Sequence, residues 1–435
     1  MNIHKENNRA GLSTLFIFFL IFFQFPAVLP AQGLARKVLF LGNSYTYVNN
    51  LPFLAASLAH FSGDSLYFDS YTPGGYTLGW QPTAHGYDPV SLAKISSDTW
   101  DFVVLQEQSQ IPAIPVLRDS CMYPSSLILH DSVKSANPCS RVLFFLTWGR
   151  RFGGMQCFTP NYCSTAFSGY NQMQDSLSRA VKGIADSLGD WISPVGEAWR
   201  YVIGTYGMVL HDADDSHPNL KGSYLAACVF YDMMFGKPSA GNSFTAGLAA
   251  DTALLLQHAA DSVALGYGTQ WNFNNDLPRV QFNLTTSGDT VFTHNLTTGA
   301  GTWLWRFGDG DTSALYEPWH VYPGPGTWNI TLHACNDCFC DSLYKPVTIT
   351  STGIQTCFLP GRNIRLTGPD NHGILKTIDF PGNGTLILQD LPGKISLSLP
   401  VTDGRVHSGN PAKGIWIWTL YTENNVFAGR GKIIF

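Results

Sequence analysis

The sequence predicts an α/β domain followed by two smaller β domains. Residues 37 to about 265 alternate short apolar runs with segments whose apolar residues recur at helical intervals. Beyond residue 270 the helical periodicity disappears, and short alternating segments are separated by Gly, Asp, Asn and Pro. Short strands that alternate with helices indicate a mostly parallel sheet covered on both faces, and the later segments indicate β-sandwiches.

The individual elements follow from local patterns. Compact apolar or alternating runs predict strands at 38–41, 65–71, 101–105 and 141–147. Helical spacing, for example of Met173, Leu177 and Ile184, predicts helices at 51–60, 172–188, 219–235 and 248–265. Further strands are expected at 279–283, 302–305, 327–332, 374–378, 385–388, 415–420 and 431–435.

Composition bounds the class of protein. The 435 residues exceed one ordinary core, so two or three domains are expected. Charged residues are 13%, aromatic residues are also 13%, and there are 42 glycines, which is typical of a folded, turn-rich chain. The net charge of -5 and the lack of a Lys/Arg stripe argue against nucleic acid as a partner.

Residues 1–31 have the pattern of a secretory signal peptide. Lys5 and Arg9 precede an apolar run at 15–25, and small residues follow at Ala27 and Ala31, after which cleavage is expected. The alternative is a membrane anchor, but the uninterrupted run at 15–23 is short against the roughly 20 apolar residues of a span. No later segment is apolar enough to span a bilayer.

Export makes close cysteine pairs candidates for disulfides. The local candidates are Cys157 with Cys163 and Cys121 with Cys139, while Cys228 lies in an apolar helical run and is expected to be a buried thiol. The nine cysteines leave at least one unpaired.

One candidate nucleophile lies at the end of the first strand. The apolar run 38–41 leads directly into Gly42-Asn43-Ser44, so a hydroxyl is presented where a buried strand ends. A nucleophilic serine needs a base, an orienting group for that base and donors for the oxyanion. His217 is the candidate base, just before Pro218, which suits a first helical position, and Asp214 is the candidate orienting group. Asp212 and Asp215 are neighbours that could replace Asp214.

Donors for the oxyanion are expected from three places. The N–H of Ser44 is one, and the N–H of Gly75 is a second, because glycine allows the backbone to approach a ligand closely. A side-chain amide at the end of the strand 101–105 is the third, and Gln106, Gln108 and Gln110 are the candidates. Each of these residues, taken alone, could instead have a structural role as a turn residue or as a hydrogen-bonded buried amide. Their occurrence together, in this order along the chain, favours a catalytic site.

At this point the motifs resemble those of the SGNH/GDSL hydrolases. Gly42-Asn43-Ser44-Tyr45, Gly74-Gly75-x-x-Leu78, the strand end at 104–109 and Asp214-x-x-His217 are similar to a bacterial subgroup of that family. The resemblance covers about 36–268 and implies a flavodoxin-like three-layer α/β/α domain that hydrolyses esters through an acyl-enzyme. It implies Ser44 as nucleophile, His217 as base, Asp214 as orienting residue and Gly75 in the oxyanion hole, with no metal or cofactor.

The motifs depart from the family in two places. Asn43 stands where Asp is usual, and the Gly-x-Asn-Asp block is absent. Counting along the chain favours Gln110 as the replacement, whereas strand alternation favours Gln106 and Gln108, of which Gln108 is preferred. The elbow Gly-x-Ser-x-Gly of the α/β-hydrolases is not matched, since Thr46 replaces the second glycine.

Two further polar residues follow predicted strands. Arg150 follows the strand at 141–147 and is either a pocket residue that meets a carboxylate or sugar hydroxyl, or a surface arginine. Glu197 ends another strand-like stretch, and a structural hydrogen bond is expected for it.

The second region, 277–351, resembles a PKD domain. The resemblance rests on Trp305-Arg306-Phe307-Gly308-Asp309-Gly310 and on the stretches 320–322 and 325–332, and it implies an Ig-like sandwich used as a spacer or binding module. Asp309 and Asp311 are either Ca²⁺ ligands or exposed turn residues. One cluster has the residue types and spacing of a zinc site: His333, Cys335, Cys338 and Cys340. Disulfides are expected there instead, because the domain is predicted to be exported.

The last region, 355–435, resembles a C-terminal sorting domain of the type IX secretion system. The resemblance rests on Gly414-Ile415-Trp416-Ile417-Trp418 and on the ending 429–435, and an ordinary accessory β domain is the alternative. Together the regions predict a secreted or surface-attached serine esterase that acts on a small ester or on an acylated carbohydrate such as an acetylated one. The alternatives are a non-catalytic adhesin with the same fold, and a lipase or peptidase with the same triad.

Overall fold

The computed structural model describes residues 33–350, 365–367, 374–378, 383–390, 396–403, 405–407, 415–424 and 427–434. The predicted signal peptide, 1–31, and Cys357 lie outside the described residues. Within them, no helix is long and apolar enough to cross a membrane.

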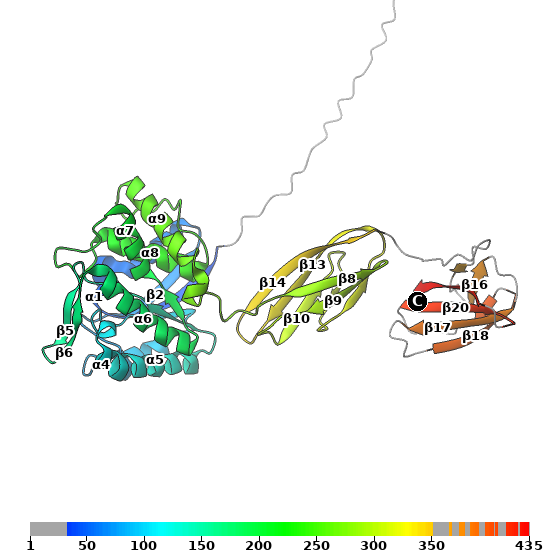
Figure 1. The fold of residues 1–435 in the computed structure, drawn as a ribbon, viewed down its shortest axis with the longest axis horizontal. Coiled ribbons are helices and arrows are strands. Elements are labelled where there is room, and N and C mark those ends of the chain that lie inside the picture. Colours follow the sequence, from blue (N-terminus) through cyan, green and yellow to red (C-terminus); the bar gives the residue numbers. More distant parts are fainter. Residues whose placement is uncertain are drawn as a thin grey trace, which may run out of the picture.

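The first domain is a parallel sheet between two layers of helices (Figure 1). Its strands are β1 (Ala35–Leu41), β2 (Ser65–Tyr71), β3 (Phe102–Leu105), β4 (Arg141–Phe145) and β7 (Trp191–Ser193). They lie in the order β2-β1-β3-β4-β7, and every neighbouring pair is parallel. The predicted three-layer α/β/α fold is therefore confirmed.

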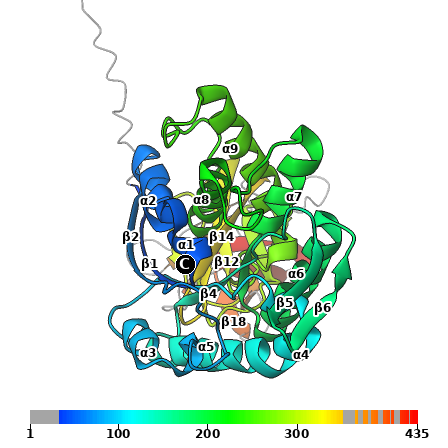
Figure 2. The ribbon, with the colours of Figure 1, turned by 90° about the vertical axis from the view of Figure 1, so that its left-hand side faces the viewer.

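Helices cover both faces of this sheet. In Figure 2, α2 and α8 lie on one face and α3 and α5 on the other. The helices are α1 (Ser44–Tyr47), α2 (Leu51–Phe61), α3 (Pro89–Ile95), α4 (Pro115–Leu117), α5 (Tyr123–Ala136), α6 (Tyr170–Leu188), α7 (Val195–Tyr206), α8 (Leu220–Phe235) and α9 (Ala250–Ala264). The strand residues Val38–Leu41 and Phe102–Leu105 are all buried, as a sheet covered on both faces requires.

Two local expectations were wrong. The stretch around Glu197 is not the end of a strand but the first turn of α7, where Glu197 pairs with Arg200 and accepts a hydrogen bond from Ser178. Pro218 does not begin the helix after His217, because Asn219 caps α8 by accepting from the N–H of Gly222. A capping side chain determines where a helix starts, because it accepts a hydrogen bond from an N–H of the first turn, whereas proline is only compatible with that position.

A short hairpin follows β4 at the carboxyl edge of the sheet. Its strands are β5 (Gly154–Thr159) and β6 (Tyr162–Phe167), joined by the predicted disulfide Cys157–Cys163. The side chain of Trp80 contacts the rings of Phe158 and Tyr162, so the hairpin packs on the loop between β2 and α3.

The second domain is a sandwich of two antiparallel sheets. One contains β11 (Thr312–Ser313), β10 (Thr302–Arg306), β13 (Gly326–Cys335) and β14 (Cys340–Ile349), and the other β12 (Trp319–Val321), β9 (Thr290–Asn295) and β8 (Phe282–Ser287). Phe282, Trp305 and Ile330 fill the space between them. Asp309 accepts a hydrogen bond of 2.6 Å from the ring of His320, which gives this turn aspartate a structural role.

The disulfides differ from the expected pairing in one case. Cys139 is bonded to Cys338 rather than to Cys121, and it therefore links the α/β domain to the tip of the β13–β14 hairpin. Beside this bond Arg141 pairs with Asp276 and lies over the ring of Phe339. Cys335 is bonded to Cys340, so the cysteines of the zinc-like cluster are used in disulfides.

The C-terminal region is also built from strands, as predicted. The sheets contain β15 (Arg365–Thr367), β16 (Ile374–Ile378) and β19 (Arg405–His407), and β18 (Ser396–Val401), β17 (Gly384–Asp390), β20 (Ile415–Thr422) and β21 (Phe427–Ile434). Leu386, Leu388, Trp416 and Trp418 form their buried core.

Candidate active site

The turn after β1 presents Ser44 at the carboxyl edge of the sheet. Gln106, at the end of the neighbouring strand β3, accepts a hydrogen bond from the N–H of Asn43 and donates one to its side-chain oxygen, at 2.8 and 2.9 Å. A Cβ at position 42 would lie 2.6 Å from the side-chain oxygen Oε1 of Gln106, so this close approach requires Gly42. Asn43 then caps α1, whose first residue is Ser44.

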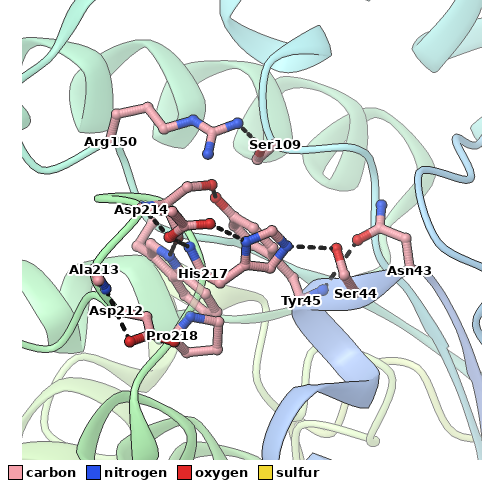
Figure 3. Close-up of polar contacts among 12 residues, drawn as sticks. Asn43, Ser44, Tyr45, Ser109, Arg150, Asp212, Ala213, Asp214, His217 and Pro218 are labelled. Carbon is pink, nitrogen blue, oxygen red and sulfur yellow. Dashed lines mark hydrogen bonds and ion pairs between the residues drawn. The ribbon is translucent and has the colours of Figure 1, made fainter.

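The three residues predicted to form a triad lie in one hydrogen-bonded line (Figure 3). The Nε2 atom of His217 is 2.9 Å from the Oγ atom of Ser44, and its Nδ1 atom is 2.5 Å from Oδ2 of Asp214. The other carboxylate oxygen of Asp214 accepts from the N–H groups of Ser216 and His217 at 3.0 and 2.9 Å. This arrangement fixes Nδ1 as the protonated ring nitrogen and leaves Nε2 free to accept the serine proton.

The surroundings of Asp214 keep it ionised. Burial would raise the pKa of Asp214, but hydrogen bonds from the ring of His217 and from the N–H groups of His217 and Ser216 outweigh it and lower that pKa to about 2. The side chains of His217 and Asp214 are 37% and 49% exposed, so the triad is open to solvent on this side.

Aromatic stacking holds the loop that carries His217. The ring of Tyr45 stacks on Trp148 at 4.6 Å, and Trp148 stacks on Trp199 at 4.0 Å. The hydroxyl of Tyr45 contacts Oγ of Ser216 at 2.8 Å, and the indole N–H of Trp148 donates to the Ser216 carbonyl at 2.9 Å. The residue after the nucleophile therefore also positions the base, a role that sequence reasoning missed.

The two backbone N–H groups predicted to hold the oxyanion have no acceptor among the described residues. The N–H of Ser44 is at the first position of α1 and has no acceptor within the helix. Gly75 has a φ of +74°, and its N–H has no acceptor among the described residues. The side chain of Asn43 donates to the carbonyl of Tyr76 at 2.7 Å, which ties the Gly75 loop to the turn that carries Ser44.

The three candidate glutamines have different roles. Gln106 was a wrong choice as an oxyanion donor, because its amide hydrogens are used by Asn43 and by the carbonyl of Glu107. The amide of Gln110 donates to the Cys157 carbonyl in the β5–β6 hairpin. Gln108 donates only to Gln110, at 3.2 Å, so one of its amide hydrogens is not used by the described residues and its predicted role stays a prediction.

Two buried residues behind the site were not anticipated. His85 is fully buried and bridges the Gly42 carbonyl and Oγ of Ser91, both at 2.8 Å, and burial lowers its pKa. Glu107 accepts from the N–H groups of Leu78 and Gln108, at 3.0 and 2.6 Å, and thus joins the Gly75 loop to the end of β3. In the sequence, both residues could have been noticed as polar side chains that lie within or beside a buried segment.

The remaining candidates lie around the triad loop. Among the described residues the carboxylate of Asp212 accepts only from the N–H of Ala213, and Asp215 pairs with Arg151, so neither replaces Asp214. Arg150 lies beside the triad and donates to Oγ of Ser109 at 3.1 Å (Figure 3).

The fold and site together define an α/β domain in which hydrogen bonds join Ser44, His217 and Asp214 at the carboxyl edge of the parallel sheet. A family model of the PKD domain matches residues 278–350, which confirms the predicted second domain. No curated protein sequence matches the chain.

Several solved structures match about half of the chain. A DUF4886 family protein from Bacteroides uniformis is 18% identical, with a TM-score of 0.46, and the match covers 54% of this chain and 96% of that one. A proposed SGNH hydrolase from Slackia heliotrinireducens is 26% identical, with a TM-score of 0.37 and coverage of 46% and 99%. An acetylxylan esterase from Geobacillus stearothermophilus, solved as a catalytic mutant, is 17% identical, with a TM-score of 0.33 and coverage of 48% and 97%.

Proposed function

We propose that this protein is a serine ester hydrolase that works through an acyl-enzyme. The observation that carries the proposal is the position of His217, whose two ring nitrogens contact Ser44 and Asp214 at once. A serine that shares a hydrogen bond with an oriented, neutral imidazole is activated as a nucleophile at neutral pH.

Each group in the site has a step in this reaction. The Oγ atom of Ser44 attacks the ester carbonyl carbon while Nε2 of His217 takes its proton. The N–H groups of Ser44 and Gly75 donate to the oxyanion of the tetrahedral intermediate, which collapses when His217 returns the proton to the leaving alcohol. Water then attacks the acyl-enzyme with His217 as base, and the carboxylic acid leaves while Ser44 regains its proton.

The test is hydrolysis of p-nitrophenyl acetate by the wild type and by Ser44→Ala. The substitution removes one oxygen at a helix start and leaves the residues around it in place, so the variant is expected to fold and to lose at least about 10³-fold in kcat. A burst of p-nitrophenol in the wild type would report the acyl-enzyme. Equal rates for the two proteins would refute the esterase and leave the non-catalytic adhesin.

We further propose that the substrate is an acylated carbohydrate. The triad is open to solvent, and the half-buried rings of Trp80, Phe158 and Tyr162 gather on the hairpin and loop next to the site, which suits a polar chain better than a long acyl group. Rates on acetylated oligosaccharides, long-chain esters and peptides would decide. A preference for long acyl chains would contradict the proposal.

Export and attachment at the cell surface are proposed on separate grounds. Residues 1–31 have the pattern of a signal peptide, and the three disulfides are typical of an oxidising compartment. The sorting role of the C-terminal strands rests on the motifs at 414–418 and 429–435. Fractionation of cells that express the full chain and a chain ending at residue 354 tests both, since only the full chain should be held at the surface.

A further inference from the structure

Arg150 is a cation beside the triad that the proposed reaction does not use. Its side chain is half-buried, and its one side-chain hydrogen bond to a described residue goes to the neutral hydroxyl of Ser109. Within the part of the chain that the structure describes, no carboxylate forms an ion pair with it. The neighbouring arginines differ, because Arg151 pairs with Asp215 and Arg141 pairs with Asp276.

The backbone of Arg150 is held against the loop that carries the triad. The N–H of Arg151 donates to the Asp215 carbonyl at 3.1 Å, and the indole of Trp148 donates to the carbonyl of Ser216. On the other side, Ser109 follows β3 and receives the guanidinium. Figure 3 shows Arg150 and Ser109 together on one side of His217 and Asp214. The guanidinium thus lies on the Ser109 side of the triad in this view.

The order of the strands separates Arg150 from the oxyanion. Gly75 follows β2, which lies on one side of β1, whereas Arg150 follows β4, two strands away on the other side. Neighbouring strands are about 4.8 Å apart, so the two loops flank Ser44 from opposite directions and β4 is about 10 Å from β1. Because the oxyanion must lie about 3 Å from the N–H groups of Ser44 and Gly75, Arg150 faces another part of the bound ester.

A guanidinium in this position has hydrogen-bond donors available for an anion. Its planar fork matches a carboxylate, and a partly desolvated cation gains most from such a partner. The chain as a whole carries a net charge of -5, which disfavours the approach of an anionic ligand elsewhere on its surface. The residue is thus suited to select an anionic substrate at this point of the site.

We propose that Arg150 binds a carboxylate of the ester substrate, so that the protein deacylates an acidic rather than a neutral ester. The inference rests on the proposed function and names its substrate class. The carboxylate belongs either to the alcohol part, as in an acylated uronic acid, or to the acyl part, as in a half-ester of a dicarboxylic acid. Both place a negative charge within a few bonds of the scissile ester.

Matched substrates test this directly. One pair is acetylated galacturonic acid and its neutral methyl ester, and the other is p-nitrophenyl hydrogen succinate and p-nitrophenyl acetate. For at least one pair the wild type is expected to prefer the charged member, with a KM that rises with salt for that member alone. The pair that shows the preference tells which part of the ester carries the carboxylate.

The variants are Arg150→Gln, Arg150→Lys and, as a matched control, Arg151→Gln. In Arg150→Gln the charged-to-neutral ratio of kcat/KM should fall about 10- to 100-fold, mainly through KM, as the loss of a charge-assisted hydrogen-bonded pair implies. Arg150→Lys keeps the charge without the fork and should give an intermediate ratio. Arg151→Gln removes the same charge one residue along and should keep the wild-type ratio.

Three results would overturn the inference: no preference in the wild type for either pair, an unchanged ratio in Arg150→Gln, or an equal drop in the ratio in Arg151→Gln. Thermal unfolding identifies a variant that does not fold, and the lysine variant then gives the decisive ratio. If Ser44→Ala is inactive while the Arg150→Gln ratio is unchanged, the carboxylate site fails and the esterase stands. If Ser44→Ala is fully active, the proposed function itself fails.

Discussion

Replacing Asp214 by Asn is the sharpest test of how the triad is held. The two carboxylate oxygens have separate tasks, since Oδ2 accepts from the ring of His217 and Oδ1 accepts from two backbone N–H groups. Asparagine has only one acceptor oxygen. If that oxygen keeps the backbone bonds, the amide NH₂ faces Nδ1 and favours the tautomer with its proton on Nε2, which cannot accept from Ser44.

The expected magnitude follows from the exposure of this pair. Two unit charges about 4 Å apart interact by about 2 kcal/mol at an effective dielectric constant of 40, a value between those of a protein surface and water. A lost charge-assisted hydrogen bond adds up to about 2 kcal/mol. Since each 1.36 kcal/mol is tenfold in rate, a total of about 2–4 kcal/mol predicts a loss of about 30- to 1,000-fold in kcat. The 49% exposure of Asp214 keeps the effect below the roughly 10⁴-fold loss known for a buried triad aspartate.

The assay is p-nitrophenyl acetate hydrolysis across pH, with Asp212→Asn as the control. Asp212 is two residues away, and within the described part of the chain its carboxylate accepts only from the N–H of Ala213, so its variant should keep at least about a third of the wild-type kcat. Thermal unfolding of both variants separates lost catalysis from lost folding. The reasoning is refuted if folded Asp214→Asn keeps more than about a third of the activity, or if Asp212→Asn loses as much.

Two other predictions concern residues behind the site. Gln108→Ala should lower kcat about 10²-fold with little change in stability, whereas Gln106→Ala should cost about 2–4 kcal/mol in urea unfolding, because the buried N–H of Asn43 loses its acceptor; the reverse pattern would assign the donor to Gln106. Burial raises the pKa of Glu107 to about 8 against two backbone donors that lower it, so the folded state binds more protons than the unfolded state. The free energy of unfolding should therefore fall as pH rises from about 4.5 to 8, and Glu107→Gln should flatten that dependence; an identical slope in the variant would contradict the shift.

Much of the fold could be predicted from local pattern. The strand at 65–71 and the helices 172–188 and 219–235 were found within two residues of β2, α6 and α8, because an alternating strand and an amphipathic or apolar helix each impose their own periodicity. The hairpin β5–β6 and the short strand β7 were missed. Their segments are too short or too polar to show a period, and contacts with the rest of the domain hold them in place.

The disulfides show where proximity in sequence misleads. Cys139 pairs with Cys338, 199 residues away, and not with Cys121. The spacing of cysteines along the chain does not predict that the α/β domain contacts the tip of the β13–β14 hairpin. The pair Cys157 and Cys163 was predictable because a short hairpin brings its own strands together.

The chemical groups of the site could be identified from the amino-acid sequence alone: a hydroxyl at a strand end, a histidine three residues after an aspartate, and a glycine that allows a positive φ. These are local features, and local geometry dictates them. The three-dimensional contacts were needed to show which glutamine hydrogen-bonds to Asn43, which aspartate faces the ring of His217 and which arginine lacks a carboxylate partner among the described residues. Those choices depend on distances between residues far apart in the chain, which close packing of the sheet and its loops sets.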